Sequence, residues 1–166
     1  GHSLIKEMIS SKNADIAGEM SGHIFYNYNY YGYDDAIYAS LKLINILNNT
    51  KKTLNELTSV YMKSSSTPEI KLYCDEKIKF SLLDKIVEDI PKHYDSGVDL
   101  ITIDGVRLET ENFWFLLRAS NTQNCIVFRL EHFVKDKFKE ELIKLISILE
   151  TYSLDIKELT SFNQTV

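Results

Sequence analysis

The dipeptide Asp104-Gly105 lies between two β-favouring runs, LITI and VRL, and it constrains the fold more than any other feature of the sequence. Asp-Gly between such runs is a strong signal for a tight β-hairpin, because the turn needs positive φ angles that glycine adopts easily. Two further runs follow, Asn112 to Arg118 and Cys125 to Glu131, in which apolar side chains alternate. Alternation is typical of strands with one buried face. The region from 100 to 131 is therefore predicted to form consecutive antiparallel strands.

A further strand and two helices are predicted on either side of these strands. Ile70 to Cys74 is predicted as the strand. The apolar stripe from Leu82 to Ile90 predicts a helix that ends at Pro91. Apolar residues repeat at helical spacing again between Phe138 and Tyr152. An order of strand, helix, four strands and helix is typical of an α+β fold. We expect a mostly antiparallel sheet of four to five strands with helices on one face.

The N-terminal part of the chain is predicted to be a separate region. A weak helix is expected from Leu4 to Ser10, and a second helix opens at Asp34-Asp35, where an Asp can cap free backbone N–H groups. The same Asp pair could instead belong to a metal site, but a helix cap is the expected role. Ile37, Leu41 and Ile44 recur along this helix at the spacing of one apolar face.

A segment rich in serine around Pro68 predicts the boundary between two domains. We assign residues 1–62 to the second part of an α/β domain, residues 63–69 to a linker and residues 70–166 to the sheet-containing domain. The sequence begins at GHS without an initiator Met, so we expect a fragment of a longer protein.

Charge and cysteine content exclude several classes of protein. The net charge is −5 and the pI is about 5.4, which argues against a general nucleic-acid binder because such a protein needs a basic surface. The two cysteines lie at no metal-like spacing, which favours a reducing compartment and a cytoplasmic protein. No apolar run approaches the roughly 20 residues of a membrane span.

The loop between the two alternating strands, RASNTQN, gathers hydrogen-bond donors. Arg118 contributes a guanidinium, Ser120 and Thr122 contribute hydroxyls, and Asn121 and Gln123 contribute amides. Such a set matches the oxygens of a phosphate group. The loop contains no acid, so we expect nothing nearby to repel an anion. The alternative is an ordinary polar hairpin loop, since Ser, Asn and Thr are common turn residues.

RASNTQNCIVFRLE closely resembles the phosphate-binding loop of the α-D-phosphohexomutases, the phosphomannomutase/phosphoglucomutase family. The match covers Arg118, Ser120, Asn121 and Thr122, and Gln123 lies inside the same loop. Asn124 replaces the proline that the family usually has there. The segments VDLITIDGVRLE, NFWFLLRAS and STPEI also resemble the C-terminal domain of that family. The resemblance implies that residues 118–123 bind phosphate.

A second loop, GEMSGH, resembles the sugar-binding loop of the same family. Glu19 matches a carboxylate that accepts hydrogen bonds from sugar hydroxyls, Ser21 matches its hydroxyl partner and His23 matches the terminal histidine. The alternative is a Gly-rich turn with a capping Glu. The segment GHSLIK resembles a further family segment, which places a histidine near the reacting sugar, and His2 would be that histidine. The alternative is that the first three residues are a cloning scar that mimics the family segment.

The resemblance implies an enzyme that interconverts hexose 6-phosphate and hexose 1-phosphate through a bound hexose 1,6-bisphosphate. Family members use a phosphorylated serine and a DGDGDR-like loop that holds Mg²⁺, and neither pattern occurs in this sequence. We therefore expect the Mg²⁺ site to lie outside this chain, no metal ligands within it and no activity from the chain alone. Mannose and glucose present similar O3 and O4 hydroxyls, so the loop does not separate the two substrates.

The partners expected from this interpretation are a hexose phosphate and the missing N-terminal domains of the same protein, without nucleic acid or membrane. A domain cut within residues 1–60 would expose a sheet edge or an apolar face, which predicts loose packing or self-association. The competing interpretation is a non-enzymatic binding module that uses a helix–sheet domain for protein contacts.

Overall fold

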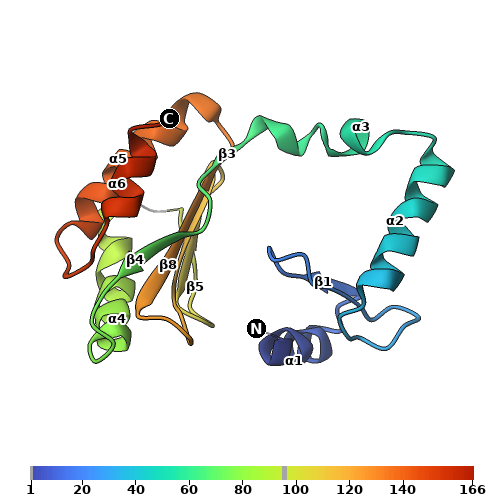
Figure 1. Ribbon diagram of the computed structural model, residues 1–166, viewed down its shortest axis with the longest axis horizontal. Coiled ribbons are helices and arrows are strands. Elements are labelled where there is room, and N and C mark those ends of the chain that lie inside the picture. The colour runs from blue at the N-terminus through green and yellow to red at the C-terminus, as the bar shows by residue number, and fades with distance from the viewer. Residues whose placement is uncertain (1, 95–96) are drawn as a thin grey trace. The chain divides into compact units, whose positions relative to one another are not determined.

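The computed structural model describes residues 2–94 and 97–166, and Figure 1 shows their arrangement. The chain divides into two compact units, Gly1–Ser59 and Val60–Val166. This division falls a few residues before the predicted linker 63–69. None of the helices among the described residues has the length and apolar character needed to cross a membrane.

The N-terminal unit combines helices with a small hairpin. Its elements are α1 (His2–Lys12), β1 (Ile16–Gly18), β2 (Ile24–Tyr26), α2 (Ala36–Thr50) and α3 (Leu54–Thr58). β1 and β2 pair antiparallel, and the pair Gly18 and Ile24 closes the hairpin. The predicted helices at the start of the chain and after Asp34-Asp35 are confirmed as α1 and α2. The hairpin and α3 are additions that sequence periodicity does not indicate.

The helix α2 begins as predicted but does not bury its apolar stripe. Asp35 is its N-cap, and the side chain accepts a hydrogen bond of 2.9 Å from the backbone N–H of Tyr38. Ile37, Leu41 and Ile44 are 77%, 59% and 52% exposed, and no residue of this helix is buried. The stripe is therefore an open apolar surface and not part of a core.

The C-terminal unit is an α+β domain built on one antiparallel sheet. Its strands are β3 (Ser65–Ser66), β4 (Ile70–Tyr73), β5 (Asp99–Ile101), β6 (Val106–Glu109), β7 (Phe113–Ala119) and β8 (Cys125–His132). Its helices are the α-helices α4 (Lys79–Asp89), α5 (Phe138–Leu149) and α6 (Lys157–Asn163) and the 3-10 helices η1 (Tyr61–Lys63), η2 (Ile90–His93) and η3 (Lys135–Lys137). In Figure 1, α4, α5 and α6 lie on one side of the sheet, as predicted.

The sheet order is β3-β8-β7-β6-β5, and β4 pairs with β8 as well. β3 and β4 pair with successive parts of β8. They therefore share one position beside β8, and the six strands occupy five positions across the sheet. Sequence analysis predicts four to five strands, and the short β3 is the addition. Thr67, inside the predicted linker, is buried, and its hydroxyl accepts a hydrogen bond of 3.0 Å from the N–H of Leu130.

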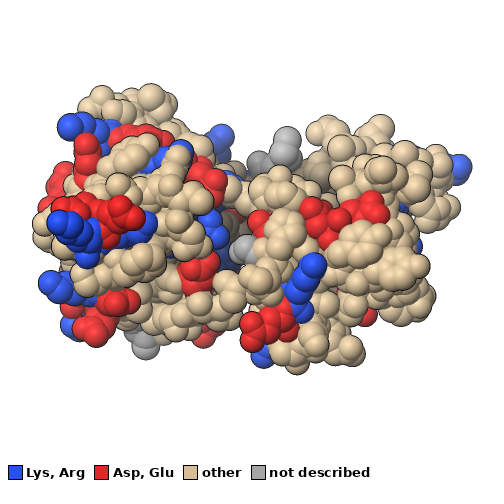
Figure 2. All heavy atoms as spheres, turned by 60° about the horizontal axis from the view of Figure 1, so that its bottom comes forward, with Lys and Arg blue, Asp and Glu red and all other residues tan. Residues whose placement is uncertain are grey.

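The core lies between the sheet and the helices. Alternate residues of β7 and β8 are buried as the pattern predicts, so that Phe115, Leu117 and Phe128 are fully covered. Leu142 and Leu145 of α5 pack in the same cluster. The opposite face of the sheet keeps half-buried side chains, including Arg118. In Figure 2, Lys and Arg side chains lie among Asp and Glu side chains on this unit, whereas most of the visible surface of the N-terminal unit is uncharged.

Candidate functional site

The loop that joins β7 to β8 presents the residues predicted to bind phosphate. Arg118 lies near the end of β7 between two buried residues, so its side chain projects from the face of the sheet that the helices leave open. Asn121, Thr122 and Gln123 are exposed. Their amide and hydroxyl groups are therefore accessible to a ligand approaching the end of the sheet.

The structure corrects the expectation that no acid lies near this loop. Asp104, in the turn between β5 and β6, places its Oδ2 atom 3.6 Å from Nη1 of Arg118, and both side chains are 39% exposed. The register that pairs Val106 with Leu117 brings this turn to the end of β7. A guanidinium carries five N–H donors, so one ion pair leaves other donors for an anion.

The hydroxyl of Ser120 organises the loop from within. Its oxygen accepts hydrogen bonds from the backbone N–H groups of Thr122, at 3.3 Å, and Gln123, at 3.1 Å. A serine hydroxyl has two acceptor sites and one proton. Because both acceptor sites are used inside the loop, the proton is the part of the hydroxyl that can be donated to an anion.

A buried lysine, which sequence analysis did not identify, supports the same loop. Lys79 is 4% exposed, and its Nζ donates hydrogen bonds to the carbonyl oxygens of Ser120, at 2.6 Å, and Gln123, at 3.0 Å. The signal was present in the sequence, because Lys79 precedes Leu82 and Leu83 at the spacing of one helix face. A lysine on a buried apolar face needs polar partners, and the loop carbonyls supply them.

In the N-terminal unit, the β1–β2 hairpin brings together the three residues predicted to bind sugar. Gly22 has φ +90° and turns the chain between Glu19 and His23, whose backbone N–H and carbonyl are joined at 2.9 Å. The Ser21 hydroxyl donates to Glu19 Oε2 at 3.2 Å and lies 2.6 Å from Nδ1 of His23. The three side chains therefore form one hydrogen-bonded cluster.

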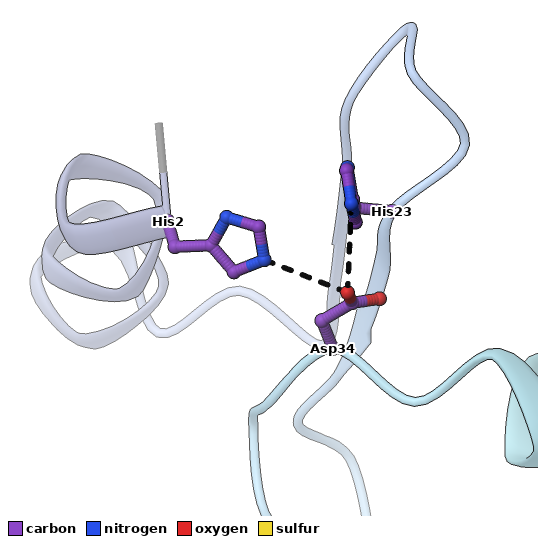
Figure 3. Close-up of side chains that lie close together, drawn as sticks. All are labelled: His2, His23 and Asp34. Carbon is purple, nitrogen blue, oxygen red and sulfur yellow. Dashed lines mark ion pairs between the residues drawn. The ribbon is translucent and has the colours of Figure 1, made fainter.

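Two further residues from other elements complete this cluster, as Figure 3 shows. His2, on α1, has Nδ1 at 3.6 Å from Glu19 Oε1 and Nε2 at 3.5 Å from Asp34 Oδ2. His23 Nε2 lies 3.9 Å from the same Asp34 oxygen. His2 thus lies beside the predicted sugar loop. Asp34 was predicted as part of a helix cap, with a metal site as the alternative, and its place beside the two histidines was not predicted.

The two adjacent acids at the start of α2 have separate roles. Asp35 accepts hydrogen bonds from the Tyr30 hydroxyl, at 2.6 Å, and from the Tyr38 N–H. These hydrogen bonds lower the pKa of the Asp35 carboxyl, and the bond from Tyr30 has the largest effect. The lowered pKa keeps the capping carboxylate ionised. Asp34 faces the histidines instead, and its Oδ1 accepts a hydrogen bond of 3.2 Å from the N–H of Ile24.

One oxygen in the cluster lacks a hydrogen bond. Glu19 Oε1 is buried, and among the described residues no donor forms a hydrogen bond with it. His2 Nδ1, at 3.6 Å, is too distant for one. A buried carboxylate oxygen without a donor is costly, so Glu19 would gain by turning this oxygen toward a hydroxyl that a ligand brings.

Comparison with known proteins covers both units. Residues 1–64 match the family model "Phosphoglucomutase/phosphomannomutase, alpha/beta/alpha domain III". Residues 69–144 match the model "Phosphoglucomutase/phosphomannomutase, C-terminal domain". The two models meet within the serine-rich segment of the sequence.

Curated relatives and a solved structure agree with these matches. A phosphomannomutase/phosphoglucomutase from Pseudomonas putida is 39% identical over 153 residues, covering 87% of this chain and 32% of the relative. A phosphoglucomutase from Neisseria meningitidis serogroup A is 37% identical over 135 residues, covering 79% of this chain and 28% of the relative. A crystal structure of a phosphoglucomutase/phosphomannomutase family protein from Burkholderia thailandensis superposes with a TM-score of 0.74 at 30% identity, covering 93% of this chain and 33% of that one.

This chain spans about a third of the length of the curated relatives it matches. Within that third, the matches to two successive family domains and the shared fold are consistent with one another. The chain belongs to the phosphoglucomutase/phosphomannomutase family, of which it carries domain III sequence and the C-terminal domain.

Proposed function

We propose that this chain supplies the sugar-binding and phosphate-binding parts of a phosphohexomutase, an enzyme that interconverts hexose 6-phosphate and hexose 1-phosphate. The names of the relatives support the reaction class, since they are phosphomannomutases and phosphoglucomutases. The free thiols of Cys74 and Cys125 support a reducing compartment such as the cytoplasm.

The observation that carries the sugar-binding proposal is the buried Glu19 Oε1 atom without a hydrogen bond. An ionised carboxylate only accepts hydrogen bonds, so Glu19 needs a donor that this part of the chain does not supply. A sugar hydroxyl is such a donor. Ser21 and His23, already bonded to one another, are placed to contact the neighbouring hydroxyl.

The phosphate-binding proposal rests on the β7–β8 loop. Arg118 offers charge-assisted donors to phosphate oxygens, and the Ser120 hydroxyl, whose oxygen accepts two internal N–H bonds, retains a proton to donate. The Lys79 ammonium adds a positive charge beneath the loop. In the proposed reaction this loop holds the phosphate that is not reacting, and hexose 1,6-bisphosphate is the intermediate that reverses its orientation between two transfers.

We place the Mg²⁺ of the proposed enzyme outside this chain. Mg²⁺ prefers six oxygen ligands, whereas the ligand cluster found among the described residues contains two imidazoles and one carboxylate. The sequence also lacks the serine loop that would carry the phosphoryl group. We therefore expect this chain alone to show no turnover of glucose 1-phosphate or mannose 1-phosphate when Mg²⁺ and a hexose bisphosphate are present, and measurable turnover would contradict this.

The phosphate-binding proposal is tested by titrating the chain with inorganic phosphate while the backbone amide signals of residues 120–123 are followed by NMR. We expect saturable shifts that Arg118→Ala weakens about tenfold or more, because a charge-assisted hydrogen bond contributes about 1.5–3 kcal/mol. Arg107→Ala is the matched control, since the Arg107 guanidinium pairs with Glu109 and stacks on Trp114 instead. Amide signals that do not shift when phosphate is added would favour the alternative interpretation, in which the chain is a non-enzymatic binding module.

A further inference from the structure

We propose that His2, His23 and Asp34 form a binding site for a divalent transition metal ion, for which Zn²⁺ is the natural probe. One ligand atom from each of these side chains lies within 4.8 Å of the other two. The three residues come from α1, from the end of the β1–β2 hairpin and from the segment before α2, and their side chains point toward one another (Figure 3). The site does not depend on the proposed function.

The geometry of the cluster indicates which nitrogen of His23 can bind a metal. Nδ1 lies 2.6 Å from Ser21 Oγ, whereas Nε2 faces Asp34. When the Ser21 hydroxyl donates to Glu19 Oε2, 3.2 Å away, the contact with Ser21 takes its proton from His23 Nδ1. In the neutral ring the lone pair is then on Nε2, which faces Asp34 Oδ2.

His2 faces two acids at longer range. Its Nδ1 lies 3.6 Å from Glu19 Oε1, beyond hydrogen-bond distance, and its Nε2 lies 3.5 Å from Asp34 Oδ2. Metal-binding histidines typically donate their other ring N–H to a carboxylate, carbonyl or water, which orients the ring. Ser21 is such an outer partner for His23, and Glu19 is the carboxylate that a small rotation would bring within hydrogen-bond distance of His2. The N–H of Ile24 orients Asp34 through Oδ1.

The three converging atoms favour a positive charge, supplied either by a proton on an imidazole or by a metal ion that all three bind. Two imidazole lone pairs and one carboxylate oxygen repel one another when neutral rings face the acid, and a bound metal ion would be stabilised by all three. In a tetrahedral zinc site, ligand distances of about 2.0–2.2 Å place neighbouring ligand atoms roughly 3.4 Å apart. The observed separations of 3.5 Å and 3.9 Å from Asp34 Oδ2 are close to this, and all three ligand atoms lie within 4.8 Å of one another, so side-chain rotations can bring them to this spacing.

The chemistry of the ligands selects the metal. Imidazole with one carboxylate suits Zn²⁺, Fe²⁺, Ni²⁺ and Cu²⁺, whereas Mg²⁺ and Ca²⁺ prefer oxygen ligands alone. The side chains of His2 and His23 are 49% and 42% exposed, which leaves a coordination position open to water. Since His23 is also a proposed sugar-binding residue, a bound metal ion would compete with the sugar.

Calorimetric titration of the chain with Zn²⁺ tests the proposal. We expect one equivalent to bind, with the affinity reduced at least tenfold in His23→Asn and in Asp34→Asn and unchanged in His93→Asn, which removes an exposed histidine of the other unit. Circular dichroism confirms that each variant is folded. Mg²⁺ is expected to give no competing signal at the same concentration.

A second measurement follows the imidazole signals by NMR during the titration. Signals of His2 and His23 are expected to shift together with the bound fraction, while those of His93 stay in place. Ser21→Ala, which removes the outer partner of His23 together with a hydrogen bond to Glu19, is expected to weaken Zn²⁺ binding about tenfold. Zn²⁺ affinity that survives both His23→Asn and Asp34→Asn would overturn the proposal, because binding would then come from the thiols or the chain terminus. Loss of phosphate binding in the other unit would not bear on this result.

Discussion

At the residue scale, the two loops depend on side chains that lie outside them in the sequence. Lys79 supports a loop that begins about forty residues later, and Asp104 pairs with Arg118 from another hairpin. His2 reaches the GEMSGH loop from α1 and Asp34 reaches it from the segment before α2. The motif residues could be predicted because the resemblance matches them one by one. His2 was matched in the same way, and the helical spacing of Lys79 indicated only that this lysine shares a face with apolar residues. The partners themselves could not be predicted, because only the folded sheet and hairpin bring Lys79, Asp104 and Asp34 close to these loops.

Lys79 provides the first prediction at this scale. In Lys79→Met the carbonyl oxygens of Ser120 and Gln123 lose their buried donor, and leaving such groups unpaired costs about 1–3 kcal/mol. We expect a loss of that size in the free energy of unfolding, measured by chemical denaturation. We also expect weaker phosphate binding, because the loop loses both its support and a nearby positive charge.

Lys85→Met is the matched control for this experiment. Lys85 lies on the same helix, α4, but is exposed, so its replacement should change the free energy of unfolding by less than about 0.5 kcal/mol. Equal effects of the two substitutions on stability and on phosphate binding would show that Lys79 has no special role in the loop.

At the element scale, the turn between β5 and β6 connects the sheet to the phosphate loop. Gly105 has φ +85°, and a Cβ atom placed there would lie 2.1 Å from the carbonyl oxygen of Leu117 and 2.9 Å from Cα of Arg118. The turn can therefore approach the end of β7 only with glycine at this position. The Asp-Gly signal correctly predicted a hairpin here, but the tight two-residue turn was wrong. β5 ends at Ile101, which pairs with Arg107, so residues 102–106 lie between the paired residues, and of the Asp-Gly pair only Gly105 has a positive φ. The register of β6 and β7 explains the close approach to Leu117 and Arg118.

Gly105→Ala should consequently do two things. The backbone clash must push the turn away from β7, which we expect to reduce the thermal unfolding midpoint substantially and to broaden the Arg118 and Asn121 backbone signals. Gly97→Ala is the control, because Gly97 also has a positive φ, +100°, but has open space where a Cβ atom would be added. A smaller loss of stability in Gly105→Ala than in Gly97→Ala would contradict this account of the turn.

The long elements of the fold were predictable and the short ones were not. Alternation over seven and eight residues indicates β7 and β8, and the cap at Asp35 indicates α2. β1 and β2 are three residues each, too short for any period to be recognised. α6 buries only Leu159 among its residues, so it carries no apolar stripe. For these elements the contacts of the folded unit decide the structure.

At the scale of the whole molecule, the two units differ in how completely they bury their apolar side chains. The C-terminal unit has a continuous core between sheet and helices. In the N-terminal unit, α2 exposes a stripe formed by Ile37, Leu41 and Ile44, and most of the surface of this unit in Figure 2 is uncharged. The helical period predicted that these residues share a face. It could not show what covers that face, because periodicity carries no information about the partner.

The stripe predicts that the chain associates with itself in solution. A contiguous apolar face is unfavourable in water, and a second copy of the same helix offers a matching surface for burial at about 25 cal/mol per Å². We expect the mass measured by sedimentation to increase with protein concentration. Amide exchange in α2 should slow over the same range, because association buries a helix that has no buried residue in one chain.

Leu41→Lys combined with Ile44→Lys tests whether this face is the one involved. Two charges on adjacent turns oppose burial of the stripe, so we expect the double variant to stay monomeric where the parent chain associates. Ile143→Lys is the control, since Ile143 is an exposed apolar residue of α5 in the other unit. A parent chain that stays monomeric with slowly exchanging α2 amides would contradict the prediction, because the exposed stripe would then be stable without any covering partner.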